Sequence, residues 1–217
     1  MVDARGKLGG HVFSKNRSGS YLRTKVTPVN GQTTAQMGVR ALFGAISQQW
    51  SGLTQAQRDA FDGAVEDWSR TDIFGDLKNP TGKNLYQRLN NQLQVAGLSA
   101  ITAPPLKLEM PDAIVSDVNI DLTADTITLT GADASASTQV VVWATAPLSQ
   151  GTKFVKNRLY QIDSFAGNVA VPGDLYTAYV AKFGAPLAGQ NIHFGIKYVL
   201  ATGQASPMQS IKATVTP

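Results

Sequence analysis

The spacing of apolar residues changes in the middle of this 217-residue chain, and the change decides which kinds of fold are open to it. From about residue 33 to residue 96, apolar side chains recur every three or four positions, as in helices with one buried face. From about residue 115 onward, apolar and polar side chains alternate, as in strands. Ala103-Pro104-Pro105 and Pro111 lie between the two patterns. The sequence therefore predicts an α+β protein, with helices first and strands after a stiff, proline-rich linker at residues 100–112.

Three helices are expected in the first part. Thr33 is a candidate N-cap because Gln36 follows three residues later, and Thr54 with Gln57 repeats this capping-box pattern. Gly52 is expected to end the first helix, and a third helix is expected from about Lys83 to Ala96. The residues expected on the buried faces are, in order, Val39, Leu42, Phe43, Ile46 and Trp50; Ala60, Phe61, Ala64, Val65 and Trp68; and Leu85, Leu89, Leu93 and Ala96. Residues 32–99 are thus predicted to form a small three-helix bundle. A domain of this size buries little apolar surface, so we expect contacts with the arm or with a neighbouring molecule to stabilise it.

The second part, residues 113–217, contains about seven short strand patterns separated by turn residues. One of them, Gln139–Ala144, is apolar enough to be covered on both faces, and Thr202-Gly203 is a good turn between the last two strands. Leu175, Tyr179 and Phe183 lie four apart, so a short helix is expected within Asp174–Phe183. This arrangement predicts an immunoglobulin-like or fibronectin-like β-sandwich. The expected strands are Val115–Leu122, Thr126–Thr130, Gln139–Ala144, Arg158–Ile162, Asn168–Val171, Ile192–Val199 and Ser210–Val215.

The positive charge of the chain is concentrated at the N-terminus, where residues 1–30 carry six basic residues and one acidic residue. This segment is rich in glycine and has two strand-like pieces, His11–Phe13 and Tyr21–Thr27, with a hairpin turn expected at Asn16-Arg17-Ser18-Gly19. It has too little apolar content to bury itself. We therefore expect residues 1–31 to form an extended basic arm that gains its shape by lying against other molecules.

No pattern for catalysis, a metal or a cofactor stands out, so the sequence predicts a protein that is not an enzyme. His11 and His193 are far apart, there is no cysteine, and Gly6-Lys7-Leu8-Gly9-Gly10 lacks the strand and the Lys-Ser/Thr ending of a phosphate-binding loop. The acidic residues Asp59, Asp62, Glu66 and Asp67 are expected on a solvated helix face. The lack of cysteine fits a reducing compartment, and no apolar run is long enough to predict a membrane span.

The arm is the candidate binding element. Its cations and aromatic rings suit an acidic protein surface, where a strand of the arm can pair with a partner strand and arginines can bind carboxylates. They also suit nucleic acid, where cations bind phosphates and aromatic rings stack on bases. Packing of the arm on the chain's own helices is a third interpretation. The predicted partner-binding residues are Arg5, Lys7, Phe13, Lys15, Arg17, Tyr21, Arg23 and Lys25.

The amino-acid sequence of the arm, in Gly6–Arg17 and Gly19–Asn30, resembles that of a group of structural proteins of tailed bacteriophages and prophages. The resemblance continues in Trp50–Arg58 and in the C-terminal part, in Ala144–Gly151, Tyr179–Gly184 and Ala201–Ser206. Gly31 departs from the related pattern, which tends to have proline after Asn30.

This resemblance implies a component of a virus particle assembled in the host cytoplasm, with other virion proteins as partners and several copies in the assembly. Within this class we expect a capsid decoration or minor head protein, with a neck, tail-ring or head–tail connector component as the alternative. A nucleic-acid-contacting protein and a host-glycan-binding protein are further alternatives. The last would use Trp143, Tyr160 and Tyr198, which the strand patterns instead predict to lie in the core.

Overall fold

The computed structural model describes residues 5–72, 75–110, 115–131, 138–149, 151–167 and 175–216. Contacts between Cα atoms divide the chain into two compact units, Met1–Gln87 and Arg88–Pro217, and the division falls inside the helix α3 (Gly82–Val95). The described residues hold four α-helices and a mixed six-stranded sheet, which confirms the α+β class. The boundaries predicted for the bundle, the linker and the sandwich stay predictions.

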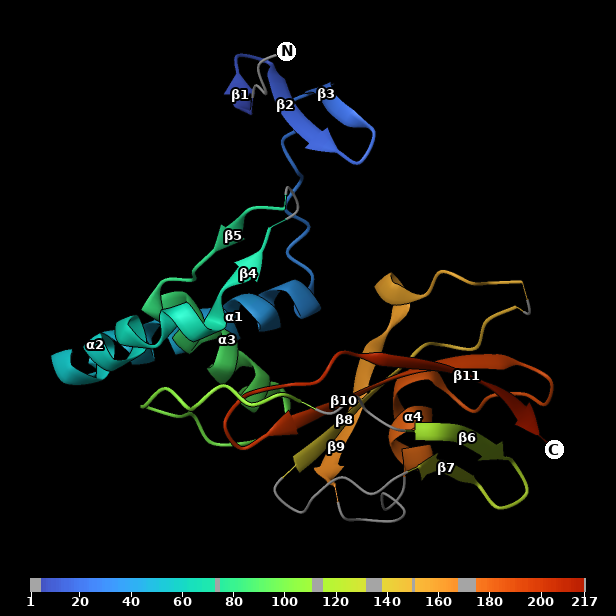
Figure 1. Cartoon of the computed structure of the whole chain (residues 1–217). Helices are drawn as coiled ribbons and strands as arrows, with labels where there is room; N and C mark the ends of the chain where they lie inside the picture. The colour runs from blue at the N-terminus through green and yellow to red at the C-terminus, as the bar shows by residue number, and fades with distance from the viewer. Residues whose placement is uncertain are drawn as a thin grey trace. The chain divides into compact units, whose positions relative to one another are not determined.

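The first unit begins with a three-stranded antiparallel sheet of β1 (Gly6–Leu8), β2 (His11–Asn16) and β3 (Gly19–Thr24), drawn in blue in Figure 1. The hairpin expected at residues 16–19 is present, whereas β1 adds a strand that the sequence did not predict. The remaining elements of the unit are α1 (Thr34–Gly52), α2 (Gln55–Gly63), the 3₁₀ turn η1 (Val65–Trp68), the paired strands β4 (Arg70–Thr71) and β5 (Leu77–Lys78), and the first half of α3.

The helices α1 and α2 begin where the capping residues predict, but α2 ends at Gly63. Val65 and Trp68 of its expected buried face therefore lie in η1, and Ala60 is exposed rather than buried. The Thr33 hydroxyl accepts a hydrogen bond from the Gln36 N–H at 3.3 Å, and Thr54 and Gln57 form a reciprocal capping box. These bonds satisfy backbone donors that the first turn of a helix leaves unpaired. The last residue of α1 is Gly52, as expected.

An aromatic cluster forms the centre of the helical part. The ring of Tyr86, which the sequence analysis did not assign to the core, lies with its centroid 5.4 Å from that of Trp50 and 5.3 Å from that of Phe61. Burial raises the pKa of the Tyr86 hydroxyl. The edge-to-face arrangement of Tyr86 and Phe61 is favourable beyond the area it buries. The other buried apolar residues of this part are Ile46, Leu53, Trp68 and Leu85.

The second unit is built on one sheet with the strand order β7-β6-β11-β10-β8-β9. Its neighbours are antiparallel except for β6 and β11, which run parallel and pair through Val215 with Ile120 and Thr216 with Asp121. The sheet curls, and α4 (Leu175–Phe183) contacts the two strands at its opposite edges, β7 and β9 (Figure 1). The strands are β6 (Val115–Asp121), β7 (Thr126–Gly131), β8 (Thr138–Ala144), β9 (Tyr160–Ala166), β10 (Asn191–Leu200) and β11 (Gln209–Thr216).

The curled sheet has a buried inner face and a partly covered outer face. The inner face and α4 form the main core, in which Leu175 and Tyr179 of the helix pack against strand residues such as Phe194. On the outer face, Val141 and Val199 pack against Ala96, which follows α3. Strand β8 is therefore covered on both sides, as its apolar sequence predicted.

The structure corrects several details of the expected strands. Arg158 lies in a 3₁₀ turn, η2 (Lys156–Arg158), so β9 begins at Tyr160, which is exposed rather than in the core. Trp143 is half-buried, and only Tyr198 of the three aromatic residues considered for glycan binding is buried as predicted. The strand expected at Asn168–Val171 lies outside the described residues. An immunoglobulin-like sandwich of two sheets and a three-helix bundle stay predictions.

Residues 98–110, which include most of the predicted linker, carry no helix or strand but are held to the second unit by side-chain amides. Asn90 accepts from the Ile101 N–H at 2.7 Å and donates to its carbonyl at 3.2 Å. Gln204 donates to the Leu106 carbonyl and accepts from the Leu108 N–H, both at 2.8 Å. These bonds replace the backbone pairing that proline-rich segments cannot complete.

Candidate functional site

The arm forms a sheet because its two connections are tight turns that suit glycine and asparagine. Arg17 and Ser18 connect β2 to β3, and the Asn16 side chain accepts a hydrogen bond from the Ser18 N–H at 2.9 Å. Gly19 follows with a φ of 117°, which other residues rarely adopt. The turn between β1 and β2 is Gly9-Gly10. Both connections are two residues long, the usual length for a hairpin between paired strands.

Pairing in this sheet separates the side chains into two different faces. Residues directly opposite one another lie on the same face, so Phe13 and Leu22 share one face, and alternation along β1 adds Leu8 to it. We call Leu8, Phe13 and Leu22 the apolar arm face. The row Lys7–Val12–Arg23 and the residue Tyr21 lie on the opposite face, which we call the basic arm face.

The described residues do not fully cover either face, although Val12 and Phe13 are half-buried. Across residues 5–30, which the structure describes throughout, no residue is buried. Leu8 is 71% exposed and Leu22 is 53% exposed, although both lie on the apolar arm face. Three short strands without a packed face are marginal in water. Exposed apolar patches of this kind mark surfaces that another molecule covers.

The predicted partner-binding residues fall into separate groups. Lys7, Tyr21 and Arg23 come together on the basic arm face, whereas Phe13 and Lys15 lie on the other side of the sheet. Outside the strands, Arg17 lies in the β2–β3 turn, Lys25 follows β3, and Arg5 forms an ion pair of 3.5 Å with Asp76. Both partners of this ion pair are exposed, so it adds little stability.

The free edge of β3 can accept another strand. The Lys25 N–H donates to the Gly10 carbonyl at 2.8 Å, which marks residues 10 and 25 as a hydrogen-bonded pair. Such pairs alternate along an antiparallel ladder, so the backbone groups of Leu22 and Thr24 point away from β2, toward the outside of the sheet. An added strand would therefore pair beside Leu22 of the apolar arm face.

The helix α1 carries a second uncovered apolar surface that the sequence analysis assigned to the core. Val39 is 68% exposed and Phe43 is 56% exposed, whereas Ile46 on the same face is buried. A helix of 19 residues is about 28 Å long, and α2, with nine residues, is about half that length. Among the described residues, the expected buried face of α1 is therefore covered near Ile46 and uncovered at Val39 and Phe43.

The remaining candidates have ordinary structural roles. The acidic residues Asp59, Asp62, Glu66 and Asp67 are all exposed, as predicted. His193 lies within β10, where burial, together with the charge of Lys212, lowers the pKa of its imidazole. Within the described residues, no three His, Asp or Glu side chains are grouped so that they could hold a metal ion.

Comparison of the chain with protein-family models, with curated proteins and with solved structures gives no match. In the described part of the chain, no helix combines the length and the apolar character needed to cross a bilayer.

Proposed function

We propose that this chain is a non-enzymatic structural protein of a bacteriophage particle, and that it docks on neighbouring subunits through its N-terminal arm. The observation that supports this most is the arm itself, a folded sheet with one apolar and one basic face and no buried residue among residues 5–30. A surface of this composition is stable when a partner covers it. The resemblance of the arm to tailed-phage structural proteins supports the same class.

Docking would bury the apolar arm face, and Lys7 and Arg23 on the basic arm face would bind an acidic surface of a second neighbour. Covering one leucine or phenylalanine side chain contributes about 1.5 to 3 kcal/mol before the cost of ordering is subtracted. The net energy for one arm is therefore modest. Many copies in one assembly would add such contacts together, because the arms of neighbouring subunits bind simultaneously.

The rest of the chain would then serve as an adapter and an outer module. We propose that the helical part is a small three-helix bundle and that the second unit is a variant of the immunoglobulin-like fold. The parallel pairing of β6 with β11 supports the latter, because it brings together the first and last described strands of the unit. The helix α4 contacts both edge strands, β7 and β9. In the proposed variant, this helix replaces strands that a complete sandwich would have at this position.

A substitution on the apolar arm face tests the proposal. The double variant Leu8→Ser with Leu22→Ser should lower incorporation of the protein into particles, and deletion of residues 2–27 should abolish it. The matched control is Leu106→Ser with Leu187→Ser, which changes two exposed leucines of the second unit. Incorporation is measured by immunoblot of purified particles. Unchanged incorporation of the arm-deleted protein would end the docking proposal.

Copy number distinguishes two positions in the particle. We propose a capsid decoration or minor head protein, for which tens to hundreds of copies are expected. A neck, connector or tail-ring component would instead be present in about six or twelve copies, arranged as a closed ring. Quantitative mass spectrometry of purified particles against a protein of known copy number separates them.

Nucleic-acid contact is a second candidate because Tyr21 lies on the same face of the arm as Lys7 and Arg23. Lysine and arginine bind phosphates, and an exposed aromatic ring can stack on a base. In that case retention on particles should fall steeply with salt and should be lost when the particles are emptied of DNA. Salt-resistant retention on emptied particles would favour protein docking instead.

A further inference from the structure

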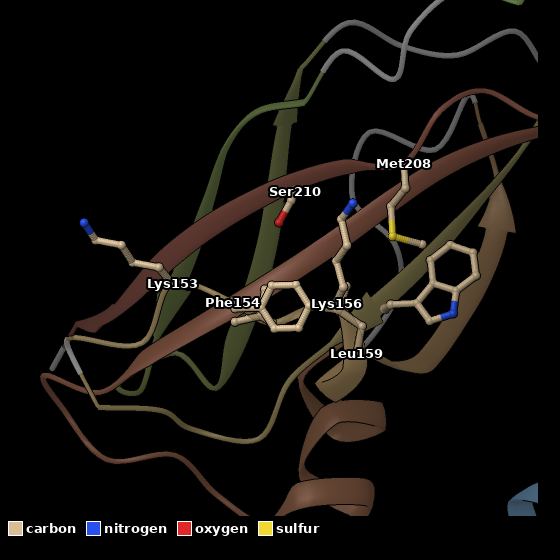
Figure 2. Close-up of a pocket in the computed structure, with 8 residues that line it drawn as sticks. Lys153, Phe154, Lys156, Leu159, Met208 and Ser210 are labelled. Carbon is tan, nitrogen blue, oxygen red and sulfur yellow. The ribbon is translucent and has the colours of Figure 1, made fainter. Parts of the chain in front are cut away.

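A pocket of about 580 Å³ lies on the outer face of the sheet in the second unit (Figure 2). Two of its lining residues, Trp143 of β8 and Ser210 of β11, are each paired with Gly195 of β10, the strand between them. Their chain neighbours Val142 and Phe194 belong to the main core on the inner face. The row Trp143–Gly195–Ser210 therefore points to the outside of the sheet.

Gly195 leaves room for two side chains that line the pocket, Met208 and Leu159. A Cβ atom at this position would lie 2.9 Å from the Met208 sulfur and 3.3 Å from Cδ1 of Leu159. Both side chains are thus packed over Gly195, and a larger residue at this position would displace them from the wall of the pocket. The glycine in this strand indicates a close approach of other groups to the backbone.

The described residues cover one part of the outer face and leave the pocket open beside it. At the other end of β8 and β10, Val141 and Val199 are buried against Ala96. The pocket instead opens beside Phe154, whose side chain is 68% exposed although its neighbour Val155 is buried. An exposed phenylalanine next to Trp143 and Met208 provides an apolar surface without an occupant, and the thioether can adapt its shape to one.

The charge around this apolar surface is positive. Lys153 and Lys156 line the pocket, and the lining residues, all of them described, include no carboxylate. Lys156 extends between Phe154 and Met208 in Figure 2, while Lys153 points away from them. Arg158 and Lys212, nearby in the sequence, are also exposed. A ligand that brings negative charge together with an apolar group would match this surface.

We propose that the pocket binds an acidic peptide segment of a partner protein, with one aromatic or aliphatic side chain inserted between Trp143 and Phe154 and flanking carboxylates beside Lys153 and Lys156. A saccharide fits less well, because sugar rings need several hydrogen-bonding groups and Ser210 provides the one uncharged side-chain hydroxyl of the lining. This binding site is separate from the arm, and the proposal does not depend on the docking of the arm.

Nuclear magnetic resonance of the ¹⁵N-labelled full chain can test the site with a synthetic peptide, acetyl-Ser-Asp-Glu-Phe-Asp-Glu-Ser-amide. We expect saturable shifts of the Gly195 and Ser210 amides and of the Trp143 indole N–H. Replacing the phenylalanine of the peptide with serine should weaken binding about tenfold, because it removes the apolar contact. Replacing the aspartates and glutamates with asparagine and glutamine should also weaken it about tenfold, because it removes the charge interaction with the lysines.

Variants of the protein locate the binding. Lys153→Glu with Lys156→Glu, and separately Phe154→Ser, should weaken binding about tenfold. Their controls are Lys107→Glu and Leu187→Ser; Lys107 is exposed, Leu187 is as exposed as Phe154, and neither lines the pocket, so their affinity should equal that of the natural sequence.

Three results would overturn the proposal: no shift at the pocket with millimolar peptide, equal binding of the amide peptide, or shifts at the pocket with N-acetylneuraminic acid but not with the peptide. Deletion of residues 2–27 should leave peptide binding unchanged. A failure here therefore leaves the docking of the arm standing, and a failure of arm docking leaves this site standing.

Discussion

The side-chain amide of Gln209 binds both backbone groups of Val115, accepting from its N–H at 3.0 Å and donating to its carbonyl at 2.7 Å. Val115 is the first residue of β6 and is buried, but the backbone pairing of β6 with β11 is confined to Val215 and Thr216 at the far end. Gln209, the first residue of β11, therefore closes the other end of the gap between these two strands.

Replacing Gln209 with alanine should lower the free energy of unfolding by about 1 to 3 kcal/mol, because it leaves a buried N–H and a buried carbonyl without their partner. Guanidinium denaturation measures the change. Gln94→Ala, at an exposed position of α3, should change the free energy by less than about 0.5 kcal/mol. Equal stability of both variants would show that water replaces the Gln209 amide.

Gly203 is expected to tolerate no side chain, because a Cβ atom there would lie 2.6 Å from the Leu89 carbonyl oxygen of α3. Its φ of 78° adds backbone strain for any other residue. Gly189 has a φ of 81° but open space around it, so it isolates the strain alone. Gly189→Ala should cost about 1 to 2 kcal/mol of stability, and Gly203→Ala should cost about 1 to 3 kcal/mol more.

Denaturation of both alanine variants separates the two effects. A similar loss in both would mean that α3 shifts to make room, and that its position against the sheet is not fixed by this contact.

The elements of this fold could be predicted from the sequence where a local signal fixes them. Thr54 with Gln57 marks a helix start, Gly97 ends α3 with a φ of 75°, and the alternation in Thr126–Thr130 gives β7. These signals depend on residues a few positions apart, so they can be interpreted without knowledge of the tertiary structure.

The rest depends on contacts between distant residues. The sequence indicates that Tyr86 and Tyr160 are aromatic, but their helix and strand neighbours decide that one is buried and the other exposed. Likewise, the two faces of the arm follow from the register of β1 and β3 on β2, which a one-residue slip would reverse. The pocket depends on Trp143, Gly195 and Ser210 lying in one row across three strands, and no pattern within a single strand predicts this row.

The uncovered end of α1 predicts a contrast between neighbouring apolar residues. Ile46→Ala should destabilise the helical part by about 2 to 5 kcal/mol, because the residue is fully buried. Phe43→Ala should change stability by less than about 0.5 kcal/mol in the isolated protein, since its side chain is mostly exposed. Denaturation followed by tryptophan fluorescence, to which Trp50 and Trp68 of the helical part contribute, measures both. A loss of several kcal/mol in Phe43→Ala would show that the chain covers this residue itself.

The absence of burial in residues 5–30, the part of the arm that the structure describes, predicts that the arm opens easily in the free protein. Trypsin should cleave after Arg17 or Arg23 well before it cleaves within the second unit. In assembled particles the same bonds should be protected, because a partner then covers the sheet. Mass spectrometry of timed digests identifies the first cuts. An arm that resists trypsin in dilute solution would contradict the proposal that partners stabilise it.

The imidazole of His193 predicts a dependence of stability on pH. It lies in β10 directly opposite Lys212, and its pKa is lowered from 6.5, first by burial and second by the charge of Lys212, while a hydrogen bond with the Thr152 backbone opposes the shift. Since the folded pKa lies below the unfolded value, the unfolded chain binds the proton first as the pH falls. The stability contributed by the neutral ring should therefore be complete above pH 6.5 and should decrease as the pH falls below it.

Denaturation midpoints at pH 8, 6.5 and 5 should show this decrease in the natural sequence and a smaller one in His193→Gln. The variant Lys212→Met should also reduce it, because the repelling charge is removed; identical pH profiles for all three proteins would show that His193 remains accessible to protons in the folded state.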